Sequence, residues 1–225
     1  MLELVVLDIA GTTVEEHGAV YRALEDAVSA AGAAPTKAQI QTWMGAGKRE
    51  AIRGLLTGPD GSIPADAVVE AAFDDFSGRL DDRYRKTPPT PMPGVTEALE
   101  LLRADGVKVA LTTGFDRAVT GRLLAGIGWD SALIDAVICI DDVPVGRPAP
   151  YMIFRAMEAV GVHNVRDVLV AGDTVRDLEA GVNSGAGLVV GVLSGQVPRD
   201  VLAATAHSHI VDSVADIPAL LERPR

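Results

Sequence analysis

Charged and hydroxyl side chains follow several apolar runs of this chain, at the points where strands of a parallel sheet would end. Asp8 closes the run at residues 4–8, Thr113 closes a second run, and Asp173 with Asp177 follows a third. Arg147 lies in a Gly-Arg-Pro loop between them. The carboxyl ends of parallel strands meet at one sheet edge, where open α/β sheets place their ligands. Carboxylates, a hydroxyl and a cation gathered there suit phosphoryl transfer, which depends on positioning and charge neutralisation.

The same residues predict a divalent cation site. Mg²⁺ prefers a few oxygen ligands and keeps several waters. Asp8, the backbone carbonyl of Ala10 and Asp173 could supply those ligands, with Asp177 as a further nearby carboxylate. Taken singly, each has an ordinary explanation; Asp177, for example, would be a first-turn acid favoured by the helix dipole. The spacing leaves open whether Thr112 or Thr113 faces the site.

Alternation of strand-like and helix-like segments predicts the fold class. Helical periodicity separates most of the short apolar runs, which indicates a Rossmann-like, doubly wound parallel sheet of the α/β class. Strands are expected at residues 4–8, 108–113, 135–140, 168–172, 188–193 and 209–211, and helices near 95–102, 149–160 and from 177.

A helical insertion interrupts this alternation. Residues 15–89 contain only helical patterns, expected at about 20–31, 36–44, around 52–56 and at 64–86. Four prolines between residues 88 and 93 favour a stiff, extended return segment. The sequence therefore predicts a catalytic core of residues 1–14 and 90–225, an inserted all-helical cap domain of residues 15–89, and two hinge strands between them. The last residues, 222–225, are expected to fray.

Composition narrows the classes of partner. The chain has 225 residues, of which 48% are apolar, and a net charge of −11. Such an acidic surface disfavours nucleic acid and anionic membranes. Cys139 is the single cysteine and lies in an apolar run, so we expect a buried, inert thiol. No signal peptide and no bilayer-length apolar run is recognisable, which favours a cytoplasmic location.

Residues 8–13, Asp-Ile-Ala-Gly-Thr-Thr, resemble the D-x-D-G-T motif of the haloacid dehalogenase (HAD) superfamily, with Ala10 in place of the second aspartate. Within that superfamily the chain resembles the phosphonatase-like phosphonoacetaldehyde hydrolases over essentially its whole length. The supporting motifs are Met-Gly-Ala-Gly-Lys at 44–48, Thr-Gly-Phe at 113–115, Val-Pro-Val-Gly-Arg-Pro-Ala-Pro at 143–150 and Gly-Asp-Thr-Val-Arg-Asp at 172–177.

The resemblance implies roles for individual residues. Asp8 would attack phosphorus, Lys48 would form an imine with the substrate aldehyde, and Thr113 and Arg147 would bind the transferring group. Asp173 would hold Mg²⁺, and Asp177 would support that site. The implied substrate contacts come from Ala10, Gly11, Thr12, Met44, Gly114 and Arg147. The resemblance also implies a small phosphonate or phosphate metabolite as substrate and a homodimer formed through the cap.

Ala10 and Lys48 are chemically consistent with each other. Breaking a P–C bond releases a carbanion unless the electrons have an acceptor, and an imine on Lys48 would be that acceptor. No strong acid at position 10 is then required. Two positions depart from the family pattern: Ala51 stands where histidine is frequent, and Phe115 stands where tyrosine is usual.

Three other functions compete with P–C hydrolysis. A phosphatase acting on a phosphate monoester such as phosphoglycolate would have to tolerate Ala10. A haloacid dehalogenase needs no metal, so it leaves Asp173 unexplained. A catalytically silent module that binds a phosphorylated metabolite would explain Ala10 but not the retention of Asp8 and Arg147.

Overall fold

The computed structural model describes residues 1–222, and the chain separates into two compact units. The first comprises Met1–Glu15 and the chain from Thr90 onward, and the second is Glu16–Pro89. The fraying expected for the C-terminus concerns residues 223–225, which lie outside the described residues, whereas Glu222 still closes the last helix.

A six-stranded parallel sheet forms the centre of the first unit. Its order is β5-β4-β1-β6-β7-β8, so the chain proceeds from the central strand β1 first to one side and then to the other. This reversal is the topological switch point at which open α/β sheets bind ligands. The expectation of a doubly wound parallel sheet is confirmed. The strands are β1 (Leu4–Asp8), β4 (Lys108–Thr112), β5 (Ala136–Ile138), β6 (Val168–Gly172), β7 (Leu188–Val192) and β8 (His209–Val211).

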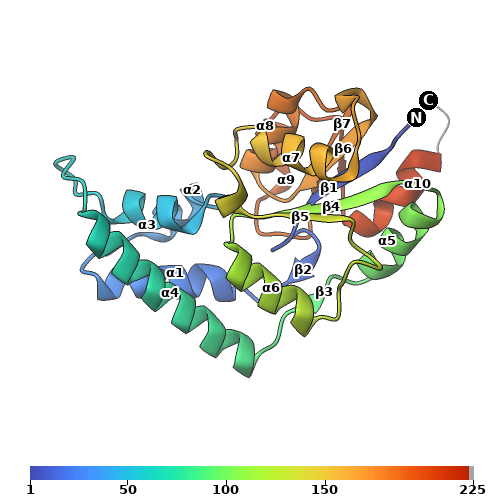
Figure 1. Ribbon diagram of the computed structural model, residues 1–225. Coiled ribbons are helices and arrows are strands. Elements are labelled where there is room, and N and C mark those ends of the chain that lie inside the picture. Colours follow the sequence, from blue (N-terminus) through green and yellow to red (C-terminus); the bar gives the residue numbers. More distant parts are fainter. Residues whose placement is uncertain (223–225) are drawn as a thin grey trace. The chain divides into compact units, whose positions relative to one another are not determined.

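Helices cover both faces of this sheet. In Figure 1, α7, α8 and α9 lie on one face, and α5, α6 and α10 lie on the other. Strands β1 and β6 are buried along their whole length, which explains why they read as continuous apolar runs. The helices are α5 (Val95–Ala104), α6 (Arg117–Gly126), α7 (Tyr151–Val160), α8 (Val175–Ser184), α9 (Arg199–Ala203) and α10 (Ile217–Glu222), with 3₁₀ turns η1 (Ile140–Asp142), η2 (Val165–Asp167) and η3 (Val214–Asp216).

The second unit is entirely helical. Thr36 caps α2 in a capping box with Gln39, as its residue type predicts. Helix α4 buries Phe73, Phe76 and Leu80 and packs against α1. The helices are α1 (Ala19–Ala30), α2 (Lys37–Thr42), α3 (Lys48–Leu56) and α4 (Asp66–Lys86).

Two short strands mark the places where the chain leaves and re-enters the first unit. Strand β2 (Val14–Glu15) pairs antiparallel with β3 (Thr90–Pro91), and Val14 lies opposite Pro91. Because both crossings lie in one ribbon, the long insertion begins and ends at a single point of the fold.

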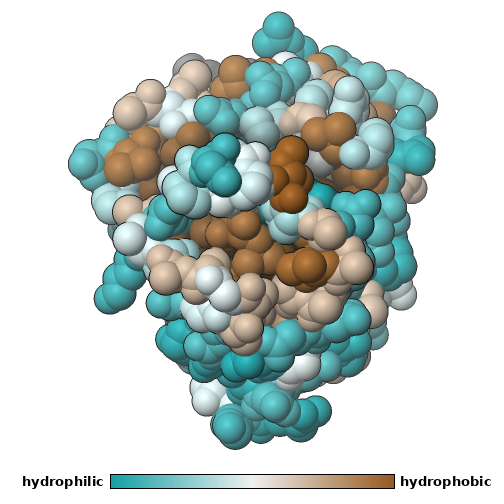
Figure 2. All heavy atoms as spheres, turned by 90° about the vertical axis from the view of Figure 1, so that its left-hand side faces the viewer, coloured by the Kyte–Doolittle hydropathy of each residue, from teal (hydrophilic) through white to brown (hydrophobic). Residues whose placement is uncertain are grey.

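Hydrophilic residues cover much of the face shown in Figure 2, and apolar residues are exposed among them. Large apolar side chains that are exposed include Ile63, Val145 and Val201. Scattered exposure of this kind is normal for protein surfaces. Within residues 1–222, every helix is too short or too polar to cross a bilayer.

Candidate active site

The site is built on a tight turn that directly follows β1. The amide groups of residues 12–14 all donate to the carbonyl of Ile9, at N···O distances between 2.8 and 3.3 Å. The Thr13 hydroxyl donates to the carbonyl of Asp8 at 2.9 Å. Gly11 has a φ of 90°, a conformation that favours glycine. The turn therefore fixes Asp8 at the carboxyl end of the central strand.

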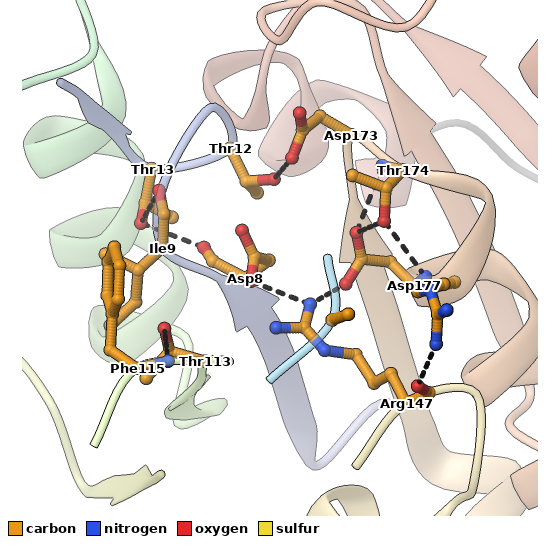
Figure 3. A network of polar contacts seen from close by, with 12 residues as sticks. Asp8, Ile9, Thr12, Thr13, Thr113, Phe115, Arg147, Asp173, Thr174 and Asp177 are labelled. Carbon is orange, nitrogen blue, oxygen red and sulfur yellow. Dashed lines mark hydrogen bonds and ion pairs between the residues drawn. The ribbon is translucent and has the colours of Figure 1, made fainter. Parts of the chain in front are cut away.

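Arg147 is buried between two carboxylates (Figure 3). Its Nη1 lies 2.7 Å from Asp8 Oδ1 and also contacts Asp177 Oδ1. The guanidinium Nε is buried and has no hydrogen-bond partner among residues 1–222. A buried donor without a protein acceptor is costly unless something else accepts its proton. An oxygen of a bound anion would satisfy it, and guanidinium groups bind phosphoryl oxygens well.

The junction of β6 and α8 fixes Asp177. Thr174 is the N-cap of α8, and its amide and hydroxyl both donate to Asp177 Oδ2, at 3.0 and 2.5 Å. A Cβ at Gly172 would lie 2.3 Å from the Asp177 carboxyl carbon, so only glycine fits there. The other oxygen of Asp177 faces Arg147. Both oxygens of Asp177 are thus engaged, which orients Arg147.

Several residues surround the Asp173 carboxylate, and only some of them were predicted from the sequence. The Thr12 hydroxyl donates to Asp173 Oδ1 at 2.9 Å. A Cβ at Gly11 or at Gly195 would come within 2.6 Å or 1.9 Å of Asp173 Oδ2, so both positions exclude side chains. The Ser194 hydroxyl donates to the Gly11 carbonyl at 2.8 Å and ties the loop after β7 to the first turn. Ser194 and Gly195 were missed, although a Ser-Gly pair after a predicted strand was a usable signal.

Three buried carboxylates converge here and can hold a metal ion. One oxygen each of Asp8, Asp173 and Asp177 lies within 4.8 Å of the others. Burial, and next the negative charge of Asp8, raise the pKa of Asp173 to about 7. A divalent cation would remove this repulsion, and the donors are the hard oxygens that Mg²⁺ prefers. The residues therefore fit the expected ion.

The segment after β4 lies beside the first turn. Asp8 is paired in register with Thr112, and both Thr112 and Thr113 are buried. The Thr113 hydroxyl oxygen accepts the amide of Phe115 at 3.1 Å, which leaves its proton to be donated elsewhere. Gly114 is buried between them. A role for Thr113 in binding a phosphoryl group stays a prediction.

Lys48 and Met44 belong to the second unit, where both are 7% exposed. Lys48 is the first residue of α3, and its Nζ donates to the carbonyl of Ala46 at 3.1 Å. Lysine is almost never buried to this extent on an ordinary surface. The burial speaks against a solvated lysine and is compatible with the expected imine. Ala51 and Phe115 are both buried and offer no proton to a ligand.

Comparison with known proteins agrees with the motifs. A family model described as haloacid dehalogenase-like hydrolase matches residues 2–185. A phosphonoacetaldehyde hydrolase of Paraburkholderia phytofirmans is 27% identical over 96% of this chain and 92% of its own. Another, of Bacillus cytotoxicus, is 30% identical over 86% of this chain and 76% of its own. A hydrolase structure from Pseudomonas syringae has a TM-score of 0.86, 21% identity and coverage of 99% and 98%. The resemblance seen in the motifs is confirmed.

Proposed function

Because this chain belongs to the haloacid dehalogenase-like hydrolases, we propose that it is a Mg²⁺-dependent hydrolase of a small phosphonate aldehyde. Phosphonoacetaldehyde is the best candidate substrate, since relatives covering nearly the whole chain carry that name. The observation that carries the proposal is the combination of a buried Lys48 with Ala10 in the turn after Asp8. Ala10 offers no acid for an alcohol leaving group, and Lys48 offers an amine for an aldehyde.

Asp8 is proposed as the nucleophile. Its carboxylate would attack phosphorus and form an acyl phosphate, which water would then hydrolyse to inorganic phosphate. Arg147 lies 2.7 Å from Asp8 and would donate its free Nε to a phosphoryl oxygen. Thr113 would donate its hydroxyl to the same group. These donors stabilise the charge that develops on the transferring phosphoryl group.

Lys48 is proposed to accept the electrons of the broken bond. Its neutral amine would add to the aldehyde and lose water to give an imine, and uptake of a proton from solvent at the imine nitrogen gives the protonated imine. When the P–C bond breaks, the bonding pair moves into this imine and forms an enamine. Protonation at carbon and addition of water then release the aldehyde and regenerate Lys48. For phosphonoacetaldehyde the products are phosphate and acetaldehyde.

Mg²⁺ would be held by Asp8, Asp173 and the backbone carbonyl of Ala10, with Asp177 supporting the site. When bound, the ion supplies positive charge that neutralises the phosphoryl oxygens. Gly11 and Gly195 approach Asp173 so closely that any side chain at either position would displace the carboxylate that would hold the ion.

The second unit is proposed to act as the cap. The sequence assigns residues 15–89 to a cap domain, and the compact helical unit spans Glu16–Pro89. In this proposal, the cap closes during the reaction so that Lys48 meets the aldehyde end of the substrate and water is excluded. Formation of a homodimer through the cap stays a prediction.

Phosphate release from a substrate panel tests this function. Phosphonoacetaldehyde, acetyl phosphate and phosphoglycolate would be compared with and without Mg²⁺. We expect phosphonoacetaldehyde to give the highest kcat/KM, because only this substrate uses Lys48. Faster turnover of phosphoglycolate would establish the phosphatase alternative instead. Binding of these compounds with no phosphate release would contradict hydrolysis altogether.

The raised pKa of Asp173 predicts that Mg²⁺ binding depends on pH. Below pH about 7 the folded protein holds Asp173 protonated, so an incoming ion must displace that proton. Apparent Mg²⁺ affinity should fall by up to about tenfold per pH unit below that value. In the metal-free protein the pH dependence of folding stability has the opposite direction. The free energy of unfolding falls as pH rises from about 4 to about 7, because Asp173 ionises less readily in the folded state than in the unfolded chain.

Thermal unfolding with and without Mg²⁺ at pH 6, 7 and 8 measures both effects. We expect the stabilisation by Mg²⁺ to grow with pH, and Asp173→Asn to abolish it. Asp200→Asn, a matched change of an exposed aspartate on α9, should retain it. Equal stabilisation by Mg²⁺ across this pH range would contradict the assignment of Asp173.

A further inference from the structure

The geometry points to Arg176 as a positioning residue for the phosphoryl-binding Arg147, an inference that rests on the proposed function of Arg147. Arg147 lies in a turn outside any helix or strand. Such a loop must be held from outside to place a buried guanidinium with useful accuracy. Helix α8 provides that support.

Two consecutive residues of α8 hold Arg147 at its two ends. Arg176 Nη1 donates to the backbone carbonyl of Arg147 at 3.0 Å. Asp177, the next residue, contacts the guanidinium of the same arginine (Figure 3). The first contact fixes the backbone from which the side chain starts, and the second orients its tip.

A second contact from α8 holds the following peptide unit. Asn183 Nδ2, near the end of the helix, donates to the carbonyl of Pro148 at 2.8 Å. Two adjacent loop carbonyls therefore accept hydrogen bonds from side chains on one helix. The capping box of Thr174 and Asp177 fixes the start of this helix. The result is a rigid connection from the β6–α8 junction to Arg147.

Preorganisation is the expected benefit. A long arginine side chain loses much conformational freedom when it binds an anion, and an arginine already held in place loses less. The buried Nε of Arg147 can serve an anion only while the loop keeps its position. Loss of the Arg176 contact should therefore weaken anion binding while leaving the carboxylates of the metal site intact.

Calorimetric titration of the Mg²⁺-loaded protein with inorganic phosphate tests this role. Arg176→Met removes the donor and retains much of the side-chain length, and we expect phosphate affinity to fall about 10- to 150-fold, the range of a charge-assisted hydrogen bond. Arg176→Lys keeps a donor and should recover part of that affinity. Arg155→Met, the same change at an exposed arginine of α7, should stay within about twofold of the wild type.

Further measurements separate positioning from other roles. Stabilisation by Mg²⁺ should be unchanged in Arg176→Met, which also shows that the variant folds. Combined with Arg147→Met, the Arg176→Met change should cost little more, because Arg176 acts through Arg147. Fully additive losses would mean that Arg176 acts independently and would overturn the inference.

Arg147→Met distinguishes this inference from the proposed function. If Arg147→Met loses phosphate affinity and Arg176→Met does not, the inference fails and the proposed role of Arg147 stands. If the wild type does not bind phosphate, or Arg147→Met binds it equally well, the proposed function fails and this inference fails with it.

Discussion

Asp8→Asn is expected to abolish phosphate release while leaving the fold intact. The amide is nearly isosteric with the carboxylate, and the turn that holds Asp8 uses its backbone carbonyl rather than its side chain. A neutral amide oxygen is a poor nucleophile, so kcat should fall by about 10⁴-fold or more. The pKa of Asp173 is raised first by burial and next by the charge of Asp8, so loss of that charge removes only the second of these two causes. The variant should therefore fold normally.

Steady-state phosphate release with saturating Mg²⁺ measures this effect, and circular dichroism with thermal unfolding confirms the fold. Asp200→Asn is the matched control, because Asp200 is exposed on α9, and it should keep full activity. Undiminished turnover by Asp8→Asn would eliminate Asp8 as the nucleophile. Full activity in excess EDTA would eliminate the metal without touching the role of Asp8.

The site residues at the strand ends were predictable because two features of the sequence agree at these positions: a buried apolar run and its alternation with helices. Asp8 and Asp173 each follow a fully buried apolar run, and parallel strands buried on both faces are apolar along their whole length. Their shared sheet edge follows from the alternation with helices. The contact of Arg147 with Asp8 could not be predicted from the sequence. Arg147 lies in a loop, and loops have no periodicity from which the direction of a side chain could be inferred.

Tertiary contacts explain where the predicted boundaries differ. The strand expected at residues 135–140 is shorter, Ala136–Ile138. Asp135 instead uses its carboxylate to accept the amide of Val109 at 2.9 Å and to pair with Arg103. At the other end, the amide of Cys139 donates to Asp142 at 2.7 Å and starts η1. Apolar residue type alone does not reveal such side-chain caps.

The short helices and the residues that support the site could not be predicted from the sequence for a related reason. Helices α9 and α10 each span less than two full turns, so their apolar periodicity is too brief to recognise. Arg176 resembles any exposed helix arginine until the carbonyl of Arg147 is seen 3.0 Å away. Gly195 becomes meaningful only through its close approach to Asp173. Each depends on a contact between segments far apart in the chain.

Lys48→Arg is expected to eliminate P–C cleavage while phosphate binding persists. Arginine keeps the positive charge but forms no productive imine, so the electrons of the P–C bond would have no acceptor. The loss in kcat should match that of a missing covalent catalyst, about 10⁴-fold or more. Lys37→Arg is the matched control, because Lys37 is also the first residue of a helix, α2, but is exposed. That variant should behave as the wild type.

Borohydride trapping tests the same lysine by a readout independent of turnover. Reduction in the presence of phosphonoacetaldehyde should inactivate the wild type irreversibly, and peptide mapping should place the adduct on Lys48. Lys37→Arg should be trapped equally well, and Lys48→Arg should resist. If the Lys48→Arg variant hydrolysed its best substrate at the normal rate, that result would contradict P–C bond cleavage through an imine. Lys48 would then be only a charge of the helical unit, and the leaving group would be an oxygen protonated by solvent or another residue, since Ala10 carries no acid.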